Sequence, residues 1–171
     1  MKKSSPAPVR WLAPVDHLAY EEIMAEIDRR LEKNLLPINV YINSEGGFVS
    51  VAISFCAEVK ERRIPLNTFV LGRCNSSAIP IMMMGRRRGM DADAHIFFHP
   101  LEFRKGEERE KIKNMTNWYK EMISKRSRLT PKDVNQLMND KALLSAAEAK
   151  KMGLIHYISD EPKEGRKKNE R

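Results

Sequence analysis

The chain has 171 residues, of which 42% are hydrophobic and 32% charged, and its formal net charge is +8 at pH 7. This length suits one domain with a single hydrophobic core, and the composition is ordinary for a globular protein in water. No stretch approaches the roughly 20 consecutive apolar residues of a membrane-spanning helix. Residues 1–8 contain no apolar run, so we expect a disordered terminus rather than a secretory signal.

The basic residues are spread along the chain instead of being gathered on one element. Short clusters occur at residues 29–30, 62–63 and 86–88, and no recognition helix or stacking sheet accompanies them. We therefore expect no nucleic-acid or membrane partner. Cys56 and Cys74 lie in apolar surroundings without metal-ligand spacing, which is typical of reduced core residues in a cytoplasmic protein. We expect no metal and no cofactor.

The first half of the chain alternates between strand and helix patterns. This β-α-β-α-β alternation predicts an α/β fold with right-handed crossovers and a mostly parallel core sheet. Apolar side chains at helical spacing predict one helix from the capping residue Asp16 to about Lys33 and another from Gly47 to about Glu61. The predicted strands are residues 9–12, 38–42, 66–71 and 96–98.

Residues 70–85 carry a strand, a break at Gly72, a small polar cluster and then an apolar segment of helical length. Ser76 and Ser77 lie where the predicted helix begins. Both serines could simply cap that helix. A strand–turn–helix junction can also expose a serine hydroxyl beside free backbone N–H groups, which would make one of the two serines a nucleophile.

Two further polar features follow predicted strands. Gly46 and Gly47 follow residues 38–42, and His99 follows residues 96–98. The carboxyl ends of parallel strands share one edge of a sheet, where ligands bind. A hydroxyl, a glycine turn with free N–H groups and a histidine suit acyl transfer. A histidine at a strand end is also often structural, and His95 is a rival four residues earlier.

The second half of the chain begins with a long, highly charged helix over about residues 106–128. Its narrow apolar stripe predicts a helix that projects or pairs with another, or a plain surface helix. Thr130 and Ser145 are expected to cap two short helices. Residues 161–171 are polar and charged, and we expect a mobile tail.

Four motifs occur in a familiar order. They are Ile42-Asn-Ser-Glu-Gly-Gly47, Gly72-Arg-Cys-Asn-Ser76, Phe98-His-Pro100 and Leu144-Ser-Ala-Ala-Glu-Ala-Lys-Lys-Met-Gly-Leu154. In this order they resemble the Clp protease proteolytic subunit family over roughly residues 9–160. The resemblance implies a single ClpP/crotonase-like domain of repeated β-α-β units, with the helix at 106–128 projecting as a handle.

The resemblance also implies roles for individual residues. Ser76 would be the nucleophile, His99 the general base and Asp140 the carboxylate of a triad. The backbone N–H groups of Gly47 and Ser77 would form the oxyanion hole. The strand after the histidine would bind the substrate backbone, with Leu101 and Phe103 as its binding residues.

The acidic member of the triad departs from the family pattern. Lys141 occupies the position four residues before Ser145 where the family has its acid, and Asp140 is one residue earlier. Asp140 can serve only if residues 142–144 absorb one extra residue. The Asn139-Asp140 pair is turn-prone, which favours such a local bulge.

Other departures surround the remaining motifs. Asn75 replaces a small residue, Glu45 stands where proline is common, and Pro100 directly follows His99 without the usual intervening residue. The interval from Ser76 to His99 is about two residues short, so we expect a trimmed loop at residues 86–93. The strand over residues 101–106 has one glycine instead of several.

The resemblance implies a cytoplasmic serine endopeptidase that cleaves unfolded proteins or peptides inside a chamber. Its main partner would be itself, as stacked rings of seven subunits. An AAA+ unfoldase is a second expected partner, although the chain starts too late to carry the family's axial loops. The alternatives are a weak or inactive assembly subunit and, more remotely, a crotonase-type acyl-thioester enzyme, which uses no Ser–His pair.

Overall fold

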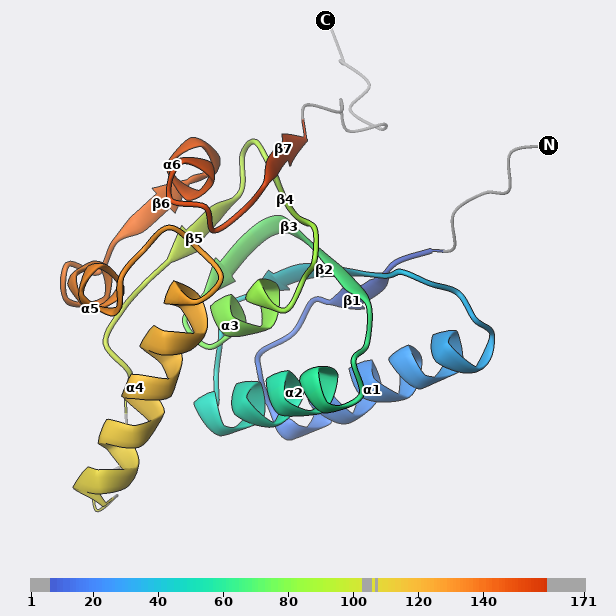
Figure 1. The fold of residues 1–171 in the computed structure, drawn as a ribbon, viewed down its shortest axis with the longest axis horizontal. Coiled ribbons are helices and arrows are strands. Elements are labelled where there is room, and N and C mark those ends of the chain that lie inside the picture. Colours follow the sequence, from blue (N-terminus) through green and yellow to red (C-terminus); the bar gives the residue numbers. More distant parts are fainter. Residues whose placement is uncertain (1–6, 103–105, 107, 160–171) are drawn as a thin grey trace, which may run out of the picture.

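The computed structural model describes residues 7–102, 106 and 108–159 (Figure 1). The predictions of a disordered start and a mobile tail therefore fall almost entirely outside the described residues. Within the described ranges, no helix is both long and apolar enough to cross a membrane.

Five parallel strands form the main path of the sheet, in the order β1-β2-β3-β4-β7. The predicted α/β class with a mostly parallel sheet is confirmed. Crossover helices return the chain to the same edge after each strand, as this topology requires. The strands are β1 (Val9–Trp11), β2 (Ile38–Ser44), β3 (Leu66–Asn75), β4 (Arg88–Asp91) and β7 (Tyr157–Ser159).

Strand β3 is longer than the sequence indicated, because it continues past Gly72 to Asn75. The register between β2 and β3 shifts between Ile42 and Ser44, which absorbs the break expected at Gly72. The extra length gives β3 a third partner besides β2 and β4. Its last three residues pair in parallel with β5 (His95–Phe97), and β5 pairs antiparallel with β6 (Leu143–Ser145).

Strand β4 corrects the expectation of a trimmed loop at residues 86–93. This strand was not predicted because it contains the charged Arg88. Arginine side chains are rarely buried unless their hydrogen-bond donors are satisfied. Here burial, together with the nearby positive charge of Arg126, lowers the pKa of Arg88 to about 10. The guanidinium donates to four main-chain carbonyls, those of Gly85, Arg126, Gly153 and Leu154.

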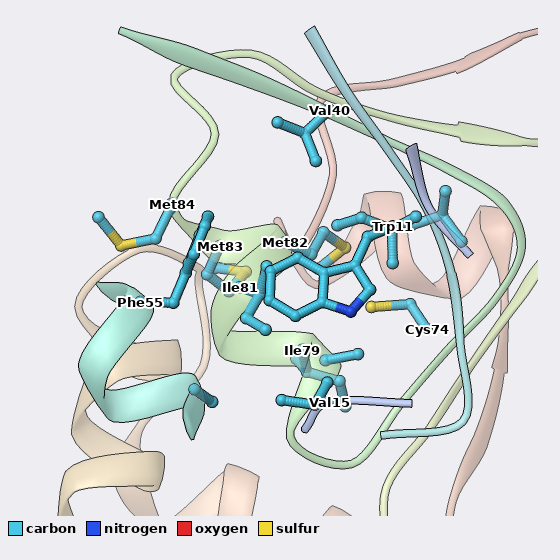
Figure 2. Close-up of a cluster of buried hydrophobic side chains, with 14 of the residues drawn as sticks. Trp11, Val15, Val40, Phe55, Cys74, Ile79, Ile81, Met82, Met83 and Met84 are labelled. Atoms are coloured by element: carbon cyan, nitrogen blue, oxygen red, sulfur yellow. The ribbon is translucent and has the colours of Figure 1, made fainter. Parts of the chain in front are cut away.

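Helices α1 (His17–Glu32), α2 (Val49–Glu61) and α3 (Ala78–Met83) lie on one side of the sheet (Figure 1). The predicted cap of α1 is confirmed, because the Asp16 side chain accepts a hydrogen bond from Ala19 N. Figure 2 shows the Trp11 indole among the side chains of α3, with Cys74 of β3 beside it. Trp11 also meets Phe55 of α2 edge to face, at 5.2 Å between ring centroids.

Helices α4 (Arg109–Ser124), α5 (Pro131–Asn139) and α6 (Ala146–Lys151) follow. The amino-terminal end of α4 extends away from the rest of the domain (Figure 1), and the helix buries only Tyr119 and Ile123. Thr130 and Ser145 form the two expected capping boxes, with Asp133 and Glu148.

Candidate active site

Ser76 forms a strained turn between β3 and α3. Its φ of +51° lies in the left-handed region, which costs a residue with a side chain roughly 1–2 kcal/mol. Two hydrogen bonds hold the turn in place. Ser76 N donates to Phe97 O at 3.0 Å, and the buried Tyr119 hydroxyl of α4 donates to Ser76 O at 3.1 Å. Strain retained at one polar residue in this way is typical of functional sites.

The two neighbouring serines differ in their surroundings. Ser77 is fully buried, and its hydroxyl has no partner among the described residues. It occupies the N-cap position of α3 without making a side-chain cap hydrogen bond, so the helix-cap interpretation gains no support. Ser76 keeps 6% of its surface exposed. Of the two hydroxyls, that of Ser76 is therefore the one a substrate can reach.

The glycine turn after β2 lies directly against Ser76. Gly46 has a φ of +89°, and a Cβ atom built on it would lie 2.6 Å from Asn75 O and 2.7 Å from Ser76 Cβ. Only glycine fits such an approach. The sequence predicted a role for Gly47 and not for Gly46. The two adjacent glycines were the sequence feature that could have indicated the close approach of Gly46 to Ser76.

Two backbone N–H groups beside the Ser76 turn are not seen as donors to any described residue. The parallel bridge between Val15 and Gly47 uses Gly46 O and Phe48 N, at 2.8 and 2.7 Å, so it leaves the N–H of Gly47 unused. Among the described backbone hydrogen bonds outside helices and strands, the N–H of Ser77 is not a donor either. The Cβ position on Gly46 is 3.2 Å from Ser77 N, so the two turns adjoin. Paired donors of this kind suit an oxyanion.

His99 lies two residues beyond the end of β5, which pairs in parallel with the last residues of β3. Phe97, two residues earlier, pairs with Asn75, whereas His95 pairs with Arg73, three residues before the serine. The sheet thus places His99 closer to the serine turn than its rival. The His99 ring stacks on Phe97 at 5.7 Å, and its Nδ1 lies 2.7 Å from Pro100 O. Within the described part of the chain, no hydrogen bond joins His99 to Ser76 or Asp140.

Among the described residues, no hydrogen bond or ion pair joins Asp140 to His99, so the place of Asp140 in a triad stays a prediction. Asp140 is the C-cap of α5, and both carboxylate oxygens accept from Gln136 Nε2, at 2.8 and 2.9 Å. Lys141 N donates to Met138 O and Ala142 N to Leu137 O, which is the Schellman pattern of a helix end. Lys141 has a φ of +50°, the left-handed conformation of this turn.

The predicted substrate-binding residues are only partly described. Leu101 is half-buried and packs against the core. Phe103 lies outside the described residues, so its role stays a prediction.

The two cysteines take no part in this arrangement. Both are free and buried, and burial raises the pKa of the Cys56 thiol to about 12 and that of Cys74 further still. Among the residues with described positions, no three His, Cys, Asp or Glu side chains gather as metal ligands would.

Comparison with known proteins gives a consistent result. Residues 9–162 match the family described as Clp protease. The fold is similar to the solved structure of a mutant of ClpP1 from Listeria monocytogenes, with a TM-score of 0.81 and 19% sequence identity. The match covers 90% of this chain and 91% of that one. A search of curated proteins finds no match.

Proposed function

Because the chain belongs to the Clp protease family, we propose that it is a serine peptidase with Ser76 as nucleophile and His99 as general base. The observation that carries the proposal is the strained Ser76 turn at the carboxyl end of β3, which lies against Gly46. A left-handed serine between a strand and a helix is the geometry of a nucleophile elbow.

The chemistry follows from these positions. His99 Nε2 takes the proton as Ser76 Oγ attacks the peptide carbonyl carbon. The carbonyl oxygen becomes an oxyanion that accepts from the N–H groups of Gly47 and Ser77. Each such donor contributes about 3–4 kcal/mol to transition-state stabilisation in serine peptidases. His99 then gives its proton to the leaving amine, and water hydrolyses the acyl-enzyme by the same steps in reverse.

The proposal requires the His99 imidazole to come within hydrogen-bond reach of Ser76 Oγ when substrate binds. Catalytic hydrogen bonds are often long in ligand-free enzymes and shorten only in the complex. Asp140 is held by Gln136, so the proposed chemistry is written for the Ser76–His99 pair. A catalytic role for Asp140 would require release from Gln136.

We further propose that the chain works as a ring assembly that admits unfolded chains. The support is the long helix α4, which buries only two side chains in the monomer. A hollow between α2 and α4 has an apolar lining that includes Ile53, Trp118 and Met122. Apolar surface of this kind is usually covered by another molecule. Proteins of this family form stacked rings and work with unfoldases, which fits a second copy as the cover.

A subunit kept for assembly alone is the second candidate. The observation in its favour is that His99 makes no described hydrogen bond to Ser76 or to Asp140.

Degradation of unfolded casein, followed with sedimentation of the same sample, separates the two candidates. We expect cleavage by the natural chain, none by Ser76→Ala, and a species many times larger than the 19.8 kDa chain in both. A large species without cleavage would favour the assembly subunit. A monomer at micromolar concentration would contradict the ring.

A further inference from the structure

We propose that the backbone carbonyl of Pro100, in place of a carboxylate, fixes the tautomer and orientation of the His99 ring. This inference rests on the proposed function, in which His99 is the general base. It makes Pro100 a positioning residue.

His99 Nδ1 lies 2.7 Å from Pro100 O. A carbonyl oxygen carries no proton and can only accept a hydrogen bond. Nδ1 must therefore be the donor and hold a hydrogen. In the neutral ring, Nε2 then carries the lone pair, as a general base that removes a serine proton requires.

The backbone around this contact is well anchored. Proline fixes its own φ, which limits where the Pro100 carbonyl can lie. On the other side, Phe98 is fully buried and its N–H donates to Ala142 O at 2.9 Å. The stacked Phe97 ring restricts rotation of the imidazole. The ring is thus held by Phe97 on one side and the Pro100 carbonyl on the other, and the Phe98 anchor fixes the backbone between them.

The carboxylate expected to do this work is engaged elsewhere. Asp140 is exposed and accepts hydrogen bonds from Gln136. The Schellman turn at Lys141 fixes the backbone from which the Asp140 side chain extends. If the β5–β6 register is continued, His99 falls opposite Lys141 and not opposite Asp140.

A carbonyl does part of what a carboxylate does. Serine peptidases that lose the triad carboxylate to an amide fall about 10⁴-fold in turnover because the tautomer is wrong. The Pro100 carbonyl selects the correct tautomer, so this loss is avoided. It carries no full negative charge to stabilise the imidazolium, so we expect a peptidase slower than one with a complete triad.

Nitrogen-15 NMR of the folded chain with labelled histidine, recorded well above the reference pKa of histidine, tests the tautomer directly. His99, assigned by the signal lost in His99→Gln, should show a protonated Nδ1 and an unprotonated Nε2. His156 is the internal control, because its Nδ1 accepts from Arg88 N at 3.0 Å and must show the opposite tautomer. An unprotonated Nδ1 at His99 would overturn the proposal.

The variant Asp140→Asn tests the carboxylate. We expect the His99 signals to stay in place and the rate of fluorophosphonate labelling to stay within twofold of the natural chain. A tenfold slower rate, or a change of tautomer, would mean that Asp140 orients the ring and that Pro100 does not. If the natural chain shows the predicted tautomer but neither labels nor cleaves, the positioning inference stands and the peptidase proposal fails.

Discussion

The nucleophile turn and the histidine loop differ in how firmly the fold holds them. Ser76 is enclosed by the glycine turn after β2, a main-chain bond from β5 and a hydroxyl from α4. His99 lies at the end of a three-residue strand, half-exposed, and relies on Phe97, Phe98 and Pro100 for its position. For the proposed peptidase, this difference predicts that the Ser76 and glycine turns are preformed and that His99 adjusts when substrate binds.

Among the variants considered, Gly46→Ala is expected to disturb the Ser76 turn most. The new methyl group would lie within 2.7 Å of two atoms of the nucleophile turn, at a φ that disfavours side chains. Overpacking and strain together predict a loss of about 3 kcal/mol in unfolding free energy and loss of fluorophosphonate labelling. Gly106→Ala is the matched control: its φ is +97°, but its Cβ would meet no atom of the described residues within 4 Å. Chemical denaturation and labelling should separate the two variants, and equal losses in both would contradict the preformed turn.

Removing one hydroxyl tests the contribution of α4. In Tyr119→Phe the Ser76 carbonyl loses its buried donor, and one such bond is worth about 1 kcal/mol. Burial raises the pKa of Tyr119 well above its usual value, so the hydroxyl stays protonated and donates across the whole working pH range. We expect lower stability and slower labelling. Tyr41→Phe is the control, since the Tyr41 hydroxyl makes no described side-chain hydrogen bond. Labelling unaffected by Tyr119→Phe would show that this contact is not needed to hold the nucleophile.

The smallest effect is expected on the histidine side, at Lys141. Its left-handed φ at the end of α5 suits glycine better than lysine, so Lys141→Gly should stabilise the fold by up to about 1 kcal/mol. Labelling should not change, because Lys141 lies outside the proposed chemistry. Slower labelling in this variant, measured beside thermal unfolding, would mean that the helix end controls the base.

Much of the framework could be predicted from local patterns. Asp16, Thr130 and Ser145 cap their helices as expected, because a cap depends on residues within one turn. The strand carrying Arg88 was missed, since its buried charge is satisfied by carbonyls that are distant in sequence.

The same difference between local patterns and long-range packing explains which features of the candidate site could be predicted from the sequence. The Gly72-to-Ser76 spacing led to the serine turn, because that spacing belongs to one continuous segment. The left-handed φ of Ser76 and the contact with Gly46 depend on tertiary packing. Asp140 was expected to turn toward His99 through a local bulge. At this point the chain forms a helix-ending turn with lysine in the position that favours glycine, and residues 143–145 pair with β5 in regular register. The residue types did not indicate this pattern.

The proposal that Ser76 is an activated nucleophile is tested most directly by reacting the folded chain with a fluorophosphonate, digesting the product and mapping the modified residue by mass spectrometry. We expect a single adduct on Ser76 that is absent from Ser76→Ala and from heat-unfolded protein. An adduct on Ser77, or no adduct on the folded chain, would contradict the assignment of Ser76.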